Sequence, residues 1–358
     1  MSTLLQTPLH DCHVAAGAKL VDFAGWDMPV QYEGVISEAK AVRERAGMFD
    51  VSHMGRTWFR GPECISLLER VTTNDVSKLN DGDSQYSLLC YDNGTCVDDL
   101  IVYRIRSDVF RLVINASNRE KDLDWIRSHN EEGVDIHDET FDTAMIAVQG
   151  PQAVAIVNSL SETGLSSVPK FSTAEASVAG VPCFLARTGY TGEDGFELIA
   201  PAAGASRIWN ALLGSGVTPC GLAARDVLRV EAGLPLYGHE LSDAINPIEA
   251  GLGWVCSKTK EYIGSGPINE MRTNGAPRKL MGIRMESKLV PRDGYRVFVG
   301  EREAGHIASG VYSPTLECGI AFAFLKSDLA VADSPCFVEV REKLQPATVV
   351  SKRFLKKD

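Results

Sequence analysis

The chain has 358 residues and a formal net charge of −11, with 44% hydrophobic and 23% charged residues. This composition is typical of a globular protein, and the length exceeds what one hydrophobic core usually organises, so two or three domains are expected. The negative charge argues against a nucleic-acid-binding protein, which needs a basic face. We therefore expect no nucleic-acid partner. No apolar run reaches membrane-spanning length, so we expect no membrane partner either.

The N-terminus and the cysteines indicate the compartment. The first residues lack the charged and apolar regions of a secretory signal and the arginines of a transit segment. The nine cysteines are odd in number and scattered, without a Cys-x-x-Cys pair. This spacing suggests neither a disulfide framework nor a zinc site. We therefore expect reduced thiols, a cytoplasmic protein and no bound metal.

Hydrophobic periodicity predicts alternating helices and strands over about the first 260 residues. Apolar residues at helical spacing occur at 35–46, 61–71, 119–129, 151–160, 203–214 and 221–233. Strand-like runs occur at 56–60, 84–90, 97–106, 109–115, 143–149, 181–187 and 195–200. The segment 246–254 is expected to lead into a further strand.

Two stretches repeat one order of elements. In both, a strand is followed by Gly-Pro and then a helix, at Gly61-Pro62 and at Gly150-Pro151. A rough alignment of the stretches places Glu197 near the position of Asp99. This predicts two related α+β halves that face each other across one cleft. The alternative is coincidence, because Gly-Pro before a helix is common.

The last quarter of the chain has a different pattern. The segment 264–278 is rich in Gly, Pro and Asn and is predicted to be a domain boundary. Beyond it, short alternating runs lack a helical period, which predicts a small antiparallel barrel or roll. The runs lie at 279–287, 295–299, 303–312, 319–324, 336–341 and 346–352.

Two adjacent carboxylates, Asp98 and Asp99, lead into the strand-like run 100–103. Because successive side chains of a strand point to opposite faces, Asp99 shares a face with Ile101 and Tyr103, and Asp98 lies on the other face. One aspartate could then point into a pocket. From these residues alone, two solvated acids at a strand entrance are the favoured interpretation.

Five further motifs accompany this stretch. They are Asp22-Phe-Ala-Gly-Trp26-Asp-Met-Pro29, Met48-Phe-Asp-Val-Ser-His53-Met54-Gly55, Arg187-Thr-Gly-Tyr190-Thr-Gly-Glu193-Asp-Gly-Phe-Glu197, Gly221-Leu-Ala-Ala-Arg225-Asp226 and Ser309-Gly-Val-Tyr-Ser-Pro-Thr-Leu316. In this order, the set closely resembles the T-protein family, the aminomethyltransferases of the glycine cleavage system. The resemblance runs from Thr7 to about Phe354, almost the whole chain.

The resemblance implies a fold and a reaction. It implies an α+β folate-binding region at 1–263, made of two related ferredoxin-like halves, and a C-terminal antiparallel β-barrel domain at 279–358. The implied reaction transfers a one-carbon unit from the aminomethyl-lipoyl arm of the H-protein to tetrahydrofolate. It gives 5,10-methylenetetrahydrofolate, ammonia and the dihydrolipoyl carrier. The implied cofactor is tetrahydrofolate as co-substrate, without a metal, and the protein is expected to be monomeric.

The resemblance also assigns residues. Asp99 matches the catalytic aspartate, which would act on a folate nitrogen, whereas Asp98 receives a structural role. Glu197 would accept two hydrogen bonds from the pterin edge. The other positions that match the family's folate pocket are Arg225, Tyr190, Tyr86, Met54, Tyr103, Asn115 and Trp254. His53 receives a structural role, and Arg292 is expected to face the same cleft.

One segment departs from the family pattern. The family often ends near a Lys-Pro-Phe-Tyr-like segment whose tyrosine approaches the folate, but here Ser351-Lys-Arg-Phe354-Leu355 has Arg for Pro and Leu for Tyr. The departure puts that C-terminal contact in doubt.

Two other functions remain open. One is a different tetrahydrofolate-dependent demethylase on the same fold, acting on a small methylated substrate. The other is a non-catalytic folate-binding relative that supports iron–sulfur assembly. The second is disfavoured because the chain has no Lys-Gly-Cys-Tyr-like motif.

Overall fold

The computed structural model describes residues 4–355. The chain forms two compact units, and each unit gathers segments that are distant in sequence. The first contains the residues up to Glu69, Asp75–Tyr86 and Leu100–Arg225. The second contains Arg70–Asn74, Ser87–Asp99 and the residues from Asp226 onward. The predicted domain limits, 1–263 and 279–358, stay a prediction.

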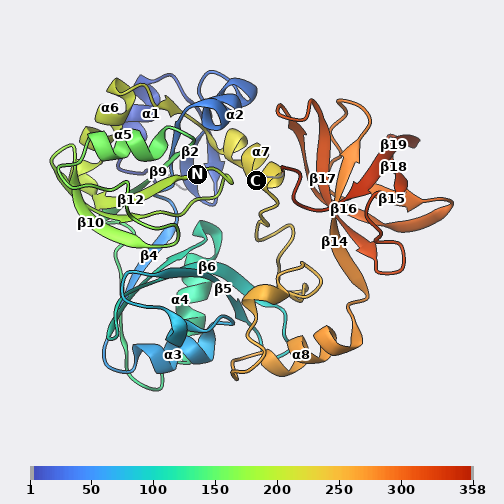
Figure 1. Cartoon of the computed structure of the whole chain (residues 1–358), viewed down its shortest axis with the longest axis horizontal. Helices are drawn as coiled ribbons and strands as arrows, with labels where there is room; N and C mark the ends of the chain where they lie inside the picture. The colour runs from blue at the N-terminus through green and yellow to red at the C-terminus, as the bar shows by residue number, and fades with distance from the viewer. Residues whose placement is uncertain (1–3, 356–358) are drawn as a thin grey trace. The chain divides into compact units, whose positions relative to one another are not determined.

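Helices and strands alternate along the first part of the chain, and strands alone make up the last part (Figure 1). The α-helices are α1 (His10–Ala15), α2 (Val35–Glu44), α3 (Cys64–Val71), α4 (Arg119–Ser128), α5 (Ala153–Ser159), α6 (Ala205–Gly214), α7 (Leu222–Ala232) and α8 (Ser265–Asn274). The strands before the barrel are β1 (Lys19–Phe23), β2 (Trp26–Gln31), β3 (Gly47–Asp50), β4 (Gly55–Arg60), β5 (Ser84–Cys90), β6 (Cys96–Arg106), β7 (Val109–Ile114), β8 (Asp135–Asp138), β9 (Thr143–Gln149), β10 (Thr173–Val178), β11 (Val181–Ala186), β12 (Gly195–Pro201) and β13 (Thr218–Pro219).

Two sheets repeat one topology. The five-stranded sheet has the order β5-β6-β7-β4-β8, and the six-stranded sheet has the order β10-β11-β12-β9-β3-β13. If β3 is set aside, each strand of one sheet has a counterpart at the same place in the other. The helices follow the same scheme along the chain. Helix α3 follows β4 as α5 follows β9, and α4 precedes β8 as α6 precedes β13. Gly61 (φ 136°) and Gly150 (φ 133°) also share one backbone conformation before their prolines. The predicted pair of related α+β halves therefore holds.

The alignment of Glu197 with Asp99 is wrong. Asp99 lies on β6, whose counterpart is β11, whereas Glu197 lies on β12, whose counterpart is β7. The sequence alignment failed because β10, a strand with mostly polar and small residues, was not recognised. Its omission shifted every later strand of the second half by one place.

Helices α5 and α6 cover one face of the six-stranded sheet (Figure 1). Their inward residues include Val157, Ile208 and Trp209, which pack against Ile146 and Leu198 of the central strands. Burial of such side chains contributes roughly 1.5–3 kcal/mol each, so this layer fixes the sheet on which β12 sits. The opposite face of β12 is left for Glu197.

The six C-terminal strands close into an antiparallel barrel around an apolar interior (Figure 1). They are β14 (Arg278–Met285), β15 (Arg296–Val299), β16 (Arg302–Ser313), β17 (Cys318–Lys326), β18 (Pro335–Val340) and β19 (Lys343–Val350). Each predicted run corresponds to one strand. The prediction of an α+β fold with a C-terminal antiparallel β-barrel is confirmed.

The Gly- and Pro-rich segment 264–278 contains helix α8, because its special residues mark the ends of a helix. Its role as a domain boundary stays a prediction. Gly264 (φ 86°) and Gly275 (φ 85°) flank α8 in conformations that suit glycine, and Pro267 lies in its first turn, where a missing N–H costs little. The prediction that 246–254 leads into a further strand is wrong, because turns and the short 3-10 helix Gly253–Val255 follow Asn246, and no described residue between them and α8 forms a strand. The Asn246 side chain supports the first turn by accepting a hydrogen bond from the Ile248 amide at 3.0 Å.

The described residues add three further findings. No helix within 4–355 has the length and apolarity needed to cross a bilayer. All nine cysteines are free thiols, and eight are buried. Within the same residues, no three His, Cys, Asp or Glu side chains gather as metal ligands would.

Candidate active site

A buried carboxylate lies in the middle of β12. Glu197 has only 6% of its surface exposed. It pairs with Ala186 of β11 and Ala147 of β9, whose short side chains leave room beside it on the same face. Desolvation by burial raises the pKa of Glu197, while the hydrogen bond from Thr188 and the charge of Arg225 oppose this shift. Such a carboxylate is poised to gain from new hydrogen-bond donors.

Thr188 holds this carboxylate in place. Its hydroxyl donates a hydrogen bond to Glu197 Oε2 at 2.5 Å. The backbone carbonyl of Thr188 accepts a hydrogen bond from Gln149 Nε2 at 3.0 Å. Gln149 Oε1 in turn accepts a hydrogen bond from Thr191 Oγ1 at 2.8 Å. The buried Gln149 side chain therefore anchors the loop that follows β11.

The loop 187–194 is fixed at both ends. Arg187 and Asp194 form a two-point ion pair, with Nε–Oδ1 and Nη2–Oδ2 distances of 3.1 and 2.8 Å. Between them, Gly189 lies so close to Gln149 that a Cβ would meet Gln149 Oε1 at 1.8 Å. A side chain at position 189 would therefore displace the Gln149 amide from its hydrogen bonds. Tyr190, which follows Gly189, is half-buried.

Arg225 enters from the first turn of α7. The turn is located by Gly221, whose amide donates a hydrogen bond to Glu38 Oε2 at 2.8 Å and whose missing Cβ would meet the Val30 backbone at 2.3 Å. The Arg225 guanidinium carbon lies 4.8 Å from the Tyr190 ring centroid, a cation–π distance. Burial lowers the pKa of Arg225, and the charge of Glu197 opposes that shift.

Tyr103 of β6 completes the cluster. Its side chain is fully buried, and burial together with the charge of Glu197 raises the pKa of its phenol. Its ring packs edge-to-face on Phe184 at a centroid distance of 5.6 Å. Tyr103 pairs with Arg111 across β6 and β7, so its position depends on the register of the five-stranded sheet.

His53 interacts electrostatically with Arg225 of the same cluster. Burial lowers the pKa of His53 to about 4, the charge of Asp50 opposes the shift, and the charges of Arg225 and Arg56 add to it. The imidazole is therefore neutral at physiological pH. Its ring packs edge-to-face on Phe23 at 5.4 Å.

Three buried polar atoms of this cluster have no hydrogen-bond partner among the described residues. They are Tyr103 Oη, Arg225 Nη1 and His53 Nδ1. Buried polar groups are nearly always paired, so such orphans call for a reason. A ligand that offers donors to Glu197 and an acceptor to Tyr103 or Arg225 would pair them. The cluster is thus a candidate binding site for a ligand that carries both hydrogen-bond donors and an acceptor.

The comparison with protein families decides the affiliation. A model of the GCVT N-terminal domain matches residues 9–260, and a model of the glycine cleavage T-protein C-terminal barrel domain matches residues 278–356. The chain belongs to the glycine cleavage T-protein family. The aminomethyltransferase of Shouchella clausii is 45% identical to it, covering 99% of this chain and 98% of the relative. The aminomethyltransferase of Geobacillus kaustophilus is 44% identical, with 99% of both chains covered.

A solved structure of the T-protein family agrees with the fold. The crystal structure of the glycine cleavage system aminomethyltransferase T from Bartonella henselae superposes with a TM-score of 0.92. Its sequence is 32% identical, and 98% of each chain is covered. The likeness therefore extends over both the α+β region and the barrel.

The structure places the other predicted T-protein site residues as follows. Met54 follows His53, Tyr86 lies on β5 and Asn115 follows the end of β7, and all three are half-buried. Asp99 is half-buried on β6, next to the fully buried Asp98. Trp254 is 69% exposed in the short 3-10 helix η4 (Gly253–Val255). Contacts of these residues with folate stay predictions.

The C-terminal segment contacts the barrel and two segments that precede it in the chain. The Phe354 ring lies 6.0 Å from the ring of Phe322, and the Leu355 amide donates a hydrogen bond to the Glu231 carbonyl at 3.2 Å. Lys352 Nζ donates a hydrogen bond to the Ala250 carbonyl at 2.8 Å. These contacts anchor the segment without the family's tyrosine.

Sequence reasoning missed Thr188 and Gln149. Both act on the site through hydrogen bonds, not through a motif of reactive residues. The only available signal was a hydroxyl residue, Thr188, at the start of a glycine-containing loop. This signal does not identify the hydrogen-bond partner of Thr188. Arg292, at the start of the turn before β15, is exposed, and its expected orientation toward the cleft stays a prediction.

Replacement of Thr188 tests its role in holding Glu197. We expect Thr188→Val to lower the free energy of unfolding at pH 7 by about 1–3 kcal/mol, because the buried carboxylate loses its donor. The loss should shrink as the pH falls through the raised pKa of Glu197, since a protonated carboxyl group needs that donor less. Urea unfolding at pH 7 and pH 4 measures both. Thr188→Ser, which keeps the hydroxyl, is the matched control; equal stability of the two variants would contradict the assignment.

Proposed function

We propose that this protein is the aminomethyltransferase of a glycine cleavage system. It transfers the one-carbon unit from the aminomethyl-lipoyl arm of a carrier protein, the H-protein, to tetrahydrofolate. The products are 5,10-methylenetetrahydrofolate, ammonia and the dihydrolipoyl carrier. The observation that carries the proposal is the buried Glu197 carboxylate in one cluster with Tyr103 Oη and Arg225 Nη1, which lack hydrogen-bond partners among the described residues, in a chain of the T-protein family.

The cluster suits the pterin of tetrahydrofolate. The 2-amino and N3–H groups of a pterin form a two-donor edge, and the ionised Glu197 carboxylate is an acceptor for both. The neighbouring carbonyl oxygen of the pterin would accept a hydrogen bond from Tyr103 Oη or Arg225 Nη1, which have no partner among the described residues. Tyr190 adds a flat face that Arg225 already stacks on. Tyr86, Met54, Asn115 and Trp254 are the further residues that we assign to the folate.

Asp99 is the proposed catalytic residue. Its carboxylate would orient the attacking folate nitrogen, accept the proton that the nitrogen loses and return a proton to the departing ammonia. Strand β6 runs unbroken from Cys96 to Arg106, so alternation puts Asp99 and Tyr103 on one face of it. Asp98 is fully buried on the opposite face, which suits a structural role. The chemistry otherwise needs positioning of the two substrates.

The proposal extends to the setting of the enzyme. The nine free thiols suit a reducing cytoplasm, and we assign the protein to that compartment. The protein acts as a monomer, with the loaded H-protein and tetrahydrofolate as its partners.

Turnover with defined donors tests the proposal. We expect ammonia release only when an aminomethylated lipoyl carrier and tetrahydrofolate are supplied together. Dimethylglycine and similar small methylated amines should give no comparable rate with the same folate. Ammonia and formaldehyde-equivalent assays on the full chain measure both. Equal or faster turnover of a free methylated amine would assign the protein to the demethylases of this fold.

The two central aspartates can be separated by mutation. We expect Asp99→Asn to lower the turnover rate by about 10²–10⁴-fold while folate affinity changes much less, because a positioned acid–base group is lost. Asp98→Asn is the matched control, and it should retain most activity with a lower melting temperature. Turnover, folate affinity and melting temperature are compared for both variants. An inactive Asp98→Asn, or losses that only follow unfolding, would overturn the assignment of Asp99.

A further inference from the structure

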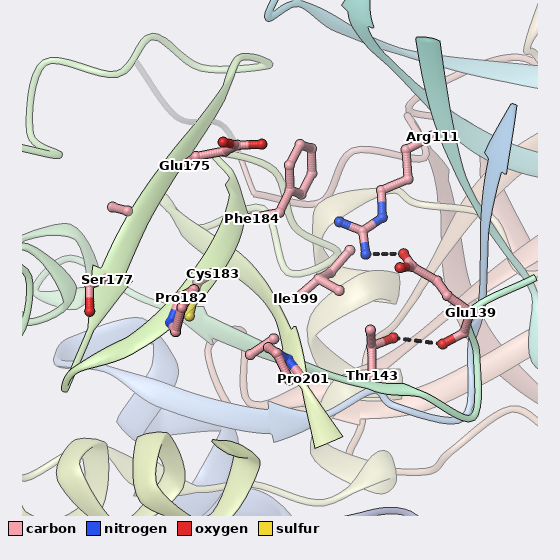
Figure 2. A pocket seen from close by; sticks show the side chains of 12 residues that line it. Arg111, Glu139, Thr143, Glu175, Ser177, Pro182, Cys183, Phe184, Ile199 and Pro201 are labelled. Carbon is pink, nitrogen blue, oxygen red and sulfur yellow. Dashed lines mark hydrogen bonds and ion pairs between the residues drawn. The ribbon is translucent and has the colours of Figure 1, made fainter. Parts of the chain in front are cut away.

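Two mostly buried ion pairs of the first unit lie outside the residues assigned to the ligand. Arg111 and Glu139 form one of them and line the cavity that Figure 2 shows. This pair joins β7 to the residue that follows β8, within one sheet. In the other pair, Arg43 Nη1 and Glu193 Oε1 lie 2.8 Å apart, and 11% and 9% of the two side chains are exposed. The second pair joins α2 to the loop 187–194, so it acts directly on a loop of the candidate site.

Arg43 binds this loop at two points. Its Nη1 atom donates hydrogen bonds to the Thr191 carbonyl at 2.6 Å and to Glu193 Oε1 at 2.8 Å. Thr191 Oγ1 accepts a hydrogen bond from the Glu193 amide at 3.1 Å and donates one to Gln149 Oε1 at 2.8 Å. A hydrogen bond with an ionised partner is stronger than a neutral one. Arg43 therefore restrains the loop at the residues that directly follow Tyr190.

The same helix also locates Arg225. Glu38 is a fully buried residue of α2, and its Oε2 atom accepts the hydrogen bond from the Gly221 amide that places the first turn of α7. Glu38 Oε1 accepts hydrogen bonds from two amides just before α2, at 2.7 and 3.0 Å. Helix α2 therefore contacts both the loop that carries Tyr190 and the helix that carries Arg225.

We propose that Arg43 is a positioning residue that holds the Tyr190 ring against the Arg225 guanidinium. The guanidinium carbon and the ring centroid lie 4.8 Å apart, and a cation–π contact requires such a close approach. Arg43 restrains the loop side of this contact, while the hydrogen bond between Glu38 and Gly221 restrains the helix side. The consequence for tetrahydrofolate rests on the proposed function, whereas the restraint on the loop does not.

Loss of the restraint should weaken folate binding without slowing the chemistry. A released loop samples conformations in which Tyr190 leaves Arg225, and a ligand that needs both residues binds only the molecules in which they are paired. The apparent Kd equals the intrinsic Kd divided by the fraction of such molecules, so a fall of this fraction to about one tenth raises the Kd about tenfold. The bound state itself is unchanged, so turnover at saturating folate should stay close to that of the parent chain.

The double variant Arg43→Gln/Glu193→Gln tests the restraint in the free protein. It removes the ion pair without leaving either charge unpaired in a mostly buried place, so the fold should persist, as circular dichroism will check. Hydrogen exchange followed by mass spectrometry should be faster in residues 187–194 and unchanged in the barrel strands, because only a local opening is made easier. Glu193→Gln alone keeps the hydrogen bond from Arg43 to Thr191 and should give a smaller increase of the same kind.

Arg45→Gln is the matched control for the exchange measurement. Arg45 is an exposed arginine at the end of the same helix, and its replacement should leave exchange of the loop as in the parent chain. Loop exchange that equals the parent's in both the double variant and Glu193→Gln would overturn the proposal. An equal increase in Arg45→Gln would do the same, since the effect would then not belong to Arg43.

Calorimetric titration with tetrahydrofolate connects the restraint to the site. We expect the double variant to bind about tenfold more weakly, with turnover at saturating folate within about twofold of the parent's. In a Tyr190→Ala background, the same two substitutions should change the affinity little, because they act through Tyr190. Parent-like affinity of the double variant, or an undiminished loss in the Tyr190→Ala background, would contradict the positioning role. A parent chain that binds no tetrahydrofolate would refute the proposed function instead, and the exchange measurement would still decide the restraint.

Discussion

The buried carboxylate of Glu197 is the constraint on which the site depends. A carboxylate in this environment is costly unless it is hydrogen-bonded, and the described structure gives it one donor, Thr188. Gln149 supports the Thr188 loop through a hydrogen bond, and the absence of a side chain at Gly189 leaves room for the Gln149 amide. The remaining acceptor capacity of Glu197, with Tyr103 Oη and Arg225 Nη1 unpaired among the described residues, is what suits the cluster to bind a ligand.

The fold supplies these residues from separate elements. Glu197 stands on a central strand whose other face is packed against α5 and α6, so the strand cannot shift without disturbing that core. Arg225 stands in the first turn of a helix that Gly221 seats against the Val30 backbone. Tyr103 stands on a strand of the other sheet, in register with Arg111. Rigid elements thus hold each side chain, as a site for an exacting one-carbon transfer requires.

Much of the fold could be predicted from the sequence, because periodicity reports burial directly. The six barrel strands lack a helical period, and each predicted run matches one of them. Periodicity did not reveal helix α8 within 264–278, because Gly and Pro occur at helix ends as well as in linkers. It also failed at β10, whose polar and small residues carry little periodic signal, and this displaced Glu197 in the comparison of the two halves.

The site was predictable only in part. Motifs pointed to Glu197, Arg225, Tyr190 and Tyr103, and the structure brings these four together. Motifs could not reveal that Thr188 orients Glu197, because a hydrogen bond between residues nine apart depends on the turn between β11 and β12. Nor could they reveal which polar atoms lack partners, since that depends on every neighbour in the folded chain.

The most direct test is the proton balance of folate binding. Because its pKa is raised, Glu197 in the free protein stays partly protonated at pH values above those at which a glutamate ordinarily ionises. Two pterin donors would favour its ionised form. Calorimetric titrations with tetrahydrofolate between pH 4.5 and 7, in buffers of different ionisation enthalpy, count the protons exchanged, about one at most for a single group. The account predicts proton release by the parent protein that is absent from Glu197→Gln. The same proton exchange in both proteins, or proton uptake by the parent chain alone, would contradict it.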